Sequence, residues 1–268
     1  YPLHKSVAIS GEAMRCYRSM TIPGIDMLCG NREYTTAKQA QSIVRQMGKK
    51  GMLSELYGVI GWDGDFREHK LHGDWQAALG VTQRVHHLAW FSMRGGRKRD
   101  YPQSIFYQSP WYREYPLIED HFARVGLAMT QGKAVCRIGL IHPIETFWLN
   151  CGTEAGSRPS LDKIEENWEN VTEWILLGGY DFDYISESML PQLCEAGSAP
   201  LQVGKSNYDV IVVPNCETLR RSTLERLKQF RNDGGTLIFM GEPPVCVDAV
   251  PDSEPIELAK RSIIIPFE

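Results

Sequence analysis

The sequence lacks several features that mark common classes of protein. No apolar run approaches the roughly 18 residues that a membrane-spanning helix needs, so we expect no membrane span. The first residues, YPLHKSVAISGEAMR, have neither the charged start nor the apolar core of a signal peptide. The net charge is only −4, from 29 Lys+Arg and 33 Asp+Glu, and it gives no general attraction to nucleic acid. We therefore predict a cytoplasmic protein that binds neither membranes nor nucleic acid.

Cysteine and metal motifs are also missing. The seven Cys residues are scattered, and no CxxC pair exists that would indicate a zinc ribbon or a disulfide framework. Reduced thiols are the expectation for such a chain. The segment EHKLHGD (68–74) brings nitrogen and oxygen ligands close in sequence, but no HExxH motif is present. The residues themselves therefore predict no metal or other cofactor.

The composition that is present changes midway along the 268 residues. A hydrophobic fraction of 43% and a charged fraction of 23% are typical of globular proteins, either one large domain or two ordinary ones. Residues 1–130 contain six of the seven His, four of the seven Trp and eight of the eleven Tyr. We therefore place a domain boundary near Gly132, with one domain over residues 1–131 and a second over residues 132–268.

The second domain alternates expected strands with expected helices. Helices are predicted by apolar spacing over residues 161–178 and 218–232, and the second of these stops at Asp233-Gly234-Gly235. Short apolar runs predict strands over residues 133–141, 208–214 and 236–240. This alternation is typical of an α/β fold with a doubly wound parallel sheet.

The first domain reads as part of a (β/α)8 barrel. Expected strands over residues 21–28, 51–54 and 85–90 end near Asp26, Glu55 and Trp90, and a helix is expected over residues 35–48. Active-site residues of such barrels lie at the carboxyl ends of the strands. Because three or four strands cannot close a barrel of eight, either a second chain or a missing N-terminal barrel portion supplies the rest. A smaller open α/β sheet is the alternative.

Glu55 is the central candidate for catalysis. It follows a short strand and precedes Leu56-Tyr57-Gly58, so an aromatic side chain can orient it and a glycine lets a substrate approach. A single strand-end glutamate is often structural. Here, however, aromatic, His and Asp residues crowd the next 35 positions.

These segments resemble a known class of enzyme. GIDML, SELYGVIGW, DWQAALGV, HHLAWFS, KRDYP and QSPWY resemble the later barrel strands of large glycoside hydrolases, with the calcium-dependent α-L-rhamnosidases most similar. SELYG also resembles the strand-seven motif of the β-galactosidase and β-glucuronidase superfamily. The resemblance, over about residues 10–150, implies that Glu55 is the nucleophile or base and that Trp90 ends strand eight. The resemblance is also compatible with a calcium ion bound through carboxylates.

The second half resembles a different domain. YDVIVVPNCETLRRSTLERLKQFRNDGGTLIFMGEPP is similar to the glutamine-amidotransferase-like flavodoxin fold that follows the barrel in β-galactosidases with a trimerisation module. The resemblance implies a partial barrel followed by a flavodoxin-like domain, and it allows a homo-oligomer. Cys216 lacks the GxCxG elbow of a nucleophile, and only His142 lies in this half, so we read Cys216 as structural.

Hydrolysis of a glycosidic bond needs two carboxyl groups, one as acid and one as nucleophile or base. Asp26 is the other strand-end acid in this chain, although an acid on a missing strand is the stronger expectation. Sugar rings stack on aromatic planes, which makes Trp62, Trp75 and Trp90 candidates for substrate binding. Tyr57, Asp63 and His87 are candidates for polar contacts with the substrate. Adjacent His86 and His87 point to opposite faces of a strand, so only one can face a pocket.

We therefore predict a fragment of a glycoside hydrolase that acts on a carbohydrate substrate by a two-carboxylate mechanism and is inactive alone. The alternative is a non-catalytic carbohydrate-binding or assembly module with an amidotransferase-like fold. The distance from Glu55 to a second carboxylate separates the two, because hydrolysis requires one within about 10 Å.

Overall fold

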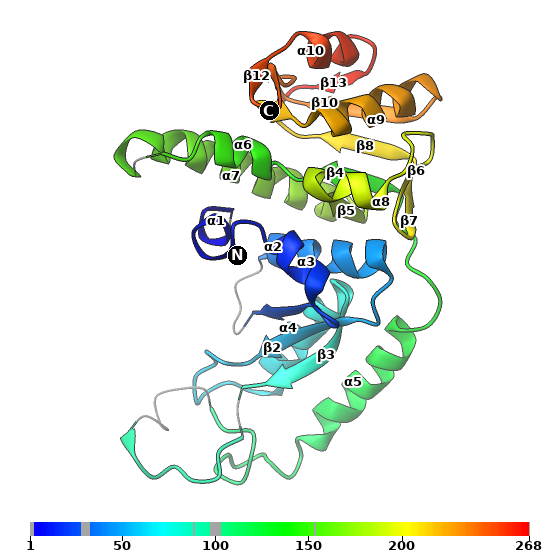
Figure 1. The fold of residues 1–268 in the computed structure, drawn as a ribbon. Helices are drawn as coiled ribbons and strands as arrows, with labels where there is room; N and C mark the ends of the chain where they lie inside the picture. Colours follow the sequence, from blue (N-terminus) through cyan, green and yellow to red (C-terminus); the bar gives the residue numbers. More distant parts are fainter. Residues whose placement is uncertain (1–2, 28–32, 88, 97–102, 153, 268) are drawn as a thin grey trace. The chain divides into compact units, whose positions relative to one another are not determined.

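The computed structural model describes residues 3–27, 33–87, 89–96, 103–152 and 154–267. The chain divides into two compact units. We call residues 20–44 and 49–133 the three-stranded unit, and residues 1–19, 45–48 and 134–268 the five-stranded unit. Figure 1 draws their helices and strands along the chain. The sequence-based domains 1–131 and 132–268 stay a prediction, and each unit is described by itself below.

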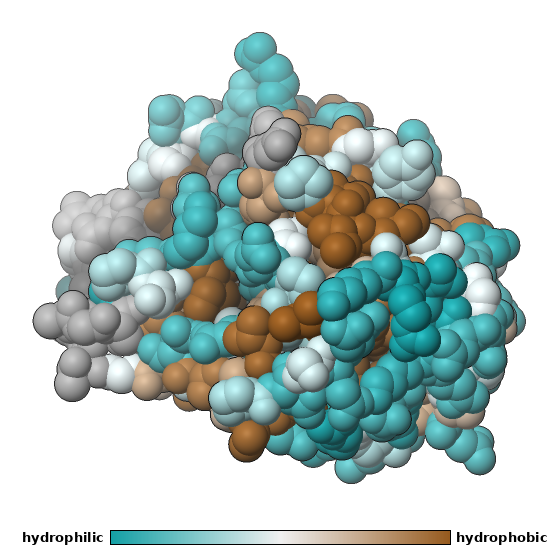
Figure 2. Space-filling model, turned by 90° about the horizontal axis from the view of Figure 1, so that it is seen from above, coloured by the Kyte–Doolittle hydropathy of each residue, from teal (hydrophilic) through white to brown (hydrophobic). Residues whose placement is uncertain are grey.

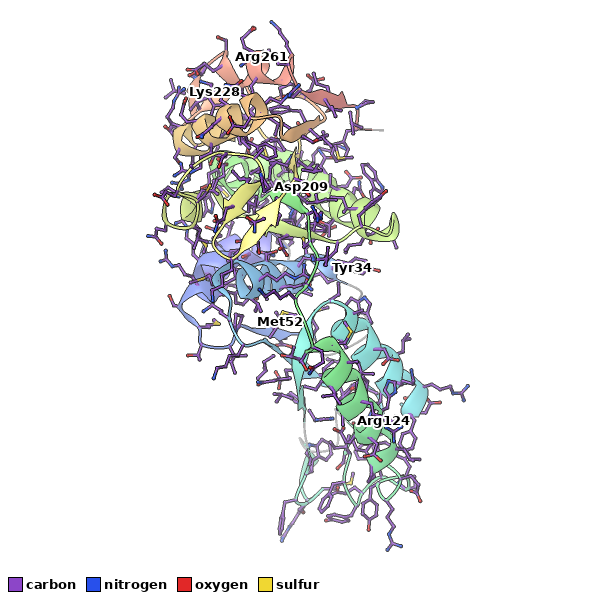
Figure 3. The ribbon with its side chains drawn as sticks, turned by 90° about the vertical axis from the view of Figure 1, so that its right-hand side faces the viewer. Tyr34, Met52, Arg124, Asp209, Lys228 and Arg261 are labelled. Atoms are coloured by element: carbon purple, nitrogen blue, oxygen red, sulfur yellow. The ribbon has the colours of Figure 1, made fainter. Side chains whose placement is uncertain are left out.

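The three-stranded unit contains a parallel sheet of order β1-β2-β3. Its strands are β1 (Gly24–Asp26), β2 (Met52–Leu56) and β3 (Val81–His86). The connections are α3 (Tyr34–Met47), whose last three residues group with the other unit, and α4 (Phe66–Ala78); α5 (Pro116–Met129) follows β3. Met52, labelled in Figure 3, is fully buried where β2 begins. Parallel strands joined through helices are what the sequence predicted for this half.

Helices α4 and α5 pack closely because α4 has a glycine at the contact. A Cβ atom on Gly73 would lie 2.0 Å from Cζ of Phe122, so only glycine lets the α5 ring approach this closely. Tyr115 and Ile118 extend the same buried cluster along α5. At its start, α4 is capped by Asp65, whose side chain accepts hydrogen bonds from the backbone N–H groups of Arg67 and Glu68.

The bounds of all three strands in this unit differ from those expected. The apolar run at 85–90 predicted a strand there, but β3 occupies Val81–His86 and Trp90 lies in the loop beyond. Polar Arg84 and His86 face a helix, where Glu119 of α5 binds both, so β3 lacks the usual apolar pattern. Glu55, expected just after a strand, lies inside β2, one residue before its end.

The five-stranded unit contains a parallel sheet of order β13-β10-β8-β4-β5 (Figure 1, green to red). In chain order the strands are β4 (Ile138–Ile141), β5 (Phe182–Ile185), β8 (Val210–Val213), β10 (Thr236–Met240) and β13 (Ile263–Ile265). Numbered by sequence, their spatial order is 2-1-3-4-5, which is the flavodoxin-like order of a doubly wound sheet. The α/β class with parallel sheets, predicted from sequence, is confirmed.

Helices and short strands complete the five-stranded unit. The helices are α1 (Leu3–Ser10), α2 (Ala13–Ser19), α6 (Ile144–Leu149), α7 (Glu154–Leu177), α8 (Leu190–Leu193), α9 (Arg221–Asn232) and α10 (Glu254–Ala259). The short strands are β6 (Leu201–Val203), β7 (Ser206–Tyr208), β9 (Thr218–Leu219), β11 (Cys246–Val247) and β12 (Val250–Pro251). Lys228 of α9, labelled in Figure 3, donates to Glu254 and so ties α9 to α10.

The N-terminal helices belong to the five-stranded unit, although the sequence assigned them to the first predicted domain. Leu3 is fully buried, and Nδ1 of His4 lies 2.5 Å from a carboxylate oxygen of Glu165 on α7. Arg15 of α2 donates to Ser188 at 2.8 Å. These partners lie more than 150 residues along the chain, so no local pattern could reveal them.

The surface mixes hydrophilic and apolar residues. Figure 2 shows separate apolar patches (brown) among hydrophilic side chains (teal) on the face it presents. The three isoleucines of edge strand β13 are all exposed. None of the helices in the described part of the chain is both long and apolar enough to cross a bilayer.

Candidate active-site face

The carboxyl end of the three-stranded sheet brings two acids together. Asp26 of β1 pairs directly with Glu55 of β2 in the parallel register. Directly paired residues of neighbouring strands point to the same face of a sheet, and the strands are about 4.8 Å apart. Asp26 and Glu55 therefore stand side by side, one strand spacing apart, near the ends of their strands.

A histidine adjoins the same pair. His87 follows β3, and its Nε2 lies 3.7 Å from Oε1 of Glu55. Both side chains are partly open to solvent, at 30% for His87 and 37% for Glu55. The other ring nitrogen of His87, Nδ1, is buried without a hydrogen-bond partner among the described residues. Nε2 is thus the atom of His87 that can interact with Glu55 or with a ligand.

His86 points to the opposite face, as expected for a neighbour in a strand. Its Nε2 lies 3.0 Å from Oε1 of Glu119, and Nη2 of Arg84 donates to Oε2 of the same carboxylate at 2.7 Å. The hydrogen bond with His86 lowers the pKa of Glu119, although burial opposes the shift. This ion network was not predicted. Its signal is the two-residue spacing of Arg84 and His86, which puts both on one face of β3.

Tyr57 lies beneath the helices and away from the acid pair. It is 2% exposed, its ring stacks on His69 of α4 with centroids 4.4 Å apart, and its hydroxyl donates to the His69 carbonyl oxygen. Its φ of +69° turns the chain sharply after β2. Burial lowers the pKa of His69 to about 4, so this ring is neutral near pH 7. The predicted contact between Tyr57 and a substrate stays a prediction.

The three candidate tryptophans are placed in two locations. Trp62 and Trp90, from the loops after β2 and β3, meet edge to face with ring centroids 5.6 Å apart. Gln108 holds this arrangement by donating to the Trp90 carbonyl at 2.6 Å. Trp75 instead contacts Tyr34, at the start of α3, with centroids 5.9 Å apart. The exposed Asp63 follows Trp62 in the same loop.

The last residue of the segment considered for metal binding uses its side chain elsewhere. Asp74 binds Lys70 and His121, whose hydrogen bonds hold the pKa of Asp74 below its usual value against the effect of burial. Across the described ranges, no group of three or more His, Cys, Asp and Glu side chains is arranged to hold a metal ion. The calcium ion implied by resemblance stays a prediction.

The chain is similar to several carbohydrate-cleaving enzymes. No protein-family profile matches the sequence. A protein of Formosa agariphila named "Putative beta-glucuronidase" is 25% identical over 216 residues, which are 76% of this chain and 16% of that protein. A rhamnosidase structure from Novosphingobium sp. PP1Y has a TM-score of 0.61 at 16% identity, over 91% of this chain and 23% of that one. The chain resembles glycoside hydrolases.

Two further structures agree with this resemblance. A β-galactosidase from Bacillus circulans has a TM-score of 0.64 at 14% identity, over 88% of this chain and 34% of that one. An exo-carrageenase from Bacteroides ovatus has a TM-score of 0.56 at 12% identity, over 96% of this chain and 36% of that one. The likeness at this identity concerns the fold, and the chain spans between about a sixth and a third of each relative. The predicted resemblance to rhamnosidases and β-galactosidases is confirmed.

Proposed function

We propose that this chain is part of a glycoside hydrolase and that its three-stranded unit carries part of the catalytic face. The observation that supports this most is the row of Asp26, Glu55 and His87 on one face, at the carboxyl end of parallel strands. In (β/α)8 barrels this edge carries the catalytic groups. The resemblance to carbohydrate-cleaving enzymes makes a carbohydrate the proposed substrate.

Within this proposal Glu55 is the nucleophile or the base. His87 lies close enough to orient its carboxylate or to share a proton with it. The acid and the nucleophile of a glycosidase flank the scissile bond from two sides. Asp26 stands beside Glu55 on the same rim, so it is better placed to bind a sugar hydroxyl than to protonate the leaving oxygen. The acid then comes from outside this sheet.

The open face of the sheet supports an incomplete barrel. Purely parallel sheets normally have both faces covered, yet Val85 is exposed beside Glu55 on the face away from α4 and α5. Further strands, from an adjoining segment or a second chain, would cover this face and close the barrel. We propose that the chain alone is inactive for this reason.

The 2-1-3-4-5 strand order of the five-stranded sheet supports an amidotransferase-like second domain.

The test is hydrolysis of a panel of p-nitrophenyl glycosides, including β-glucuronide, β-galactoside and α-L-rhamnoside. We expect no turnover by the purified 268-residue chain. The chain joined to the coding sequence upstream of Tyr1 should hydrolyse one of them, and Glu55→Gln should lower its kcat at least about a thousandfold. Glu114→Gln, at an exposed glutamate of the same unit, is the matched control and should leave kcat unchanged.

Two results would contradict parts of this proposal. Turnover by the chain alone that Glu55→Gln abolishes would show that no missing segment is needed. An active longer protein that is indifferent to Glu55→Gln would remove Glu55 from the mechanism. Saccharide binding by the longer protein without any turnover would favour the alternative, a carbohydrate-binding or assembly module.

A further inference from the structure

The five-stranded unit contains a pocket at the carboxyl edge of its sheet. The pocket has a volume of about 520 Å³, within the range of small-molecule sites, and is formed by this unit alone. Its walls come from α6 and α7, which follow β4, and from the segments after β8 and β10. The neighbouring strands β4 and β8 are strands 1 and 3 of the order 2-1-3-4-5. After β4 the next strand, β5, is added on one side of the sheet, whereas β8, β10 and β13 are added on the other side. Ligands of open α/β sheets bind at this switch point.

One buried polar atom in the wall of the pocket lacks a hydrogen bond. Asn167 of α7 lines the pocket and is 5% exposed, and its Oδ1 has no partner within the described ranges. Leaving a buried amide oxygen unpaired is destabilising, and most such groups in folded proteins are satisfied. This oxygen is shielded from solvent, so it becomes available to a ligand in the pocket when the Asn167 amide turns about its side chain, and a donor on the ligand would then satisfy it.

The remaining polar groups favour a neutral ligand with several donors. Glu217 and Glu242 line the rim with carboxylates, and Asn150 and Asn215 add amides. Lys163 is the one cation among the described residues of the lining. The formal charge of this lining is therefore −1, which disfavours anions. Asn150 donates to Glu217 at 2.7 Å, which holds that carboxylate in place and leaves its other oxygen to accept. Two prolines, an isoleucine and a valine add apolar surface to the walls and suit a C–H face.

We propose that this pocket binds a neutral saccharide, with Asn167 Oδ1 and the rim carboxylates accepting hydrogen bonds from its hydroxyl groups. Cys216 takes no part in chemistry here, because burial raises the pKa of its thiol well above the usual value and keeps it protonated. The proposal concerns binding only, so it does not depend on Glu55 or on hydrolysis. It stands or falls separately from the proposed function.

The test is titration of the 268-residue chain with glucose, galactose, rhamnose and lactose, followed by backbone amide chemical shifts. We expect at least one to bind with a Kd below about 10 mM and to shift amides of residues 146–150, 160–167, 215–217 and 242–245. Glucuronate and choline are the charged probes, and both should bind more weakly than that sugar. Tighter binding of either probe, or no response to any of the four sugars, would overturn the proposal.

Two variants test the contacts. Asn167→Leu removes the unpaired oxygen at similar volume, so it should preserve or raise thermal stability while weakening the sugar about tenfold. Glu242→Gln changes an exposed rim residue and should weaken the sugar several-fold. Glu195→Gln, an exposed glutamate of the same unit outside the pocket lining, is the matched control. Unchanged affinity in both pocket variants would refute the proposed site, and if Asn167→Leu does not fold, Glu242→Gln alone decides.

Discussion

The contact between α4 and α5 makes a quantitative prediction for Gly73→Ala. Alanine is better than glycine within a helix by about 1 kcal/mol. The new Cβ, however, would lie 2.0 Å from Cζ and 2.5 Å from Cε1 of Phe122, whereas carbon atoms in contact are normally about 3.5–4.0 Å apart. The ring or the whole of α5 must therefore move by roughly 1.5 Å. Overpacking of this kind costs about 1–3 kcal/mol, so we expect a net loss of about 1 kcal/mol.

Gly126 of α5 is the matched control for this change. A Cβ atom there meets nothing within 4 Å, so Gly126→Ala should gain stability through helix propensity alone, by about 0.5–1 kcal/mol. The assay is hydrogen exchange of α4 and α5 peptides in increasing urea, which reports the local free energy of unfolding. The two variants should differ by about 2 kcal/mol. Equal and stabilising effects of both substitutions would refute the packing argument.

Three further predictions concern the five-stranded unit. Burial raises the pKa of Glu187 to about 8 from its ordinary 4.5. Between these pH values the folded state holds a proton that the unfolded state has lost, so thermal stability should fall as pH rises from 4.5 to 8. Glu187→Gln should flatten this dependence. Asp183 is fully buried and binds Arg45 at 3.0 Å, so Asp183→Ala should destabilise the unit by about 3–5 kcal/mol in urea unfolding. Iodoacetamide should modify exposed Cys151 in the native protein and spare Cys216 until denaturant is added, as peptide mass spectrometry would show.

Regular elements with a simple apolar pattern could be predicted closely from the sequence. The run at 236–240 is β10 over the same residues, and the helix expected at 35–48 is α3, Tyr34–Met47. The glycines expected to end α9 do so, and Gly234 has a φ of +90°. In each case the pattern is local, because burial of one face or both imposes it on consecutive residues.

Prediction failed where a side chain is satisfied by a distant partner. The strand predicted at 85–90 lies four residues later than β3. The prediction missed it because Arg84 and His86 pair with Glu119, 33 or more residues away. β5 was not foreseen, since Asp183 interrupts its apolar run and is paired with Arg45 from α3. A charge within a strand looks unfavourable until its buried partner is known.

The candidate site divides in the same way. Residue type and spacing were enough to select Glu55, Asp26 and His87, because carboxylates and imidazoles near strand ends suit acid–base chemistry. The register that pairs Asp26 with Glu55 depends on hydrogen bonds between segments some thirty residues apart. The turn that buries Tyr57 depends on its contact with α4. No spacing rule describes either.

The sequence by itself determined the α/β class, the position of several helices and strands, and the resemblance to glycoside hydrolases, because these follow from local periodicity and short motifs. Only the tertiary structure decided that helices α1 and α2 belong to the five-stranded unit. It alone showed that Asn167 is buried with an unpaired oxygen in a pocket whose walls span residues 146–245. Burial and pairing are properties of the folded chain, because they depend on which distant groups fill or leave open the space around each side chain.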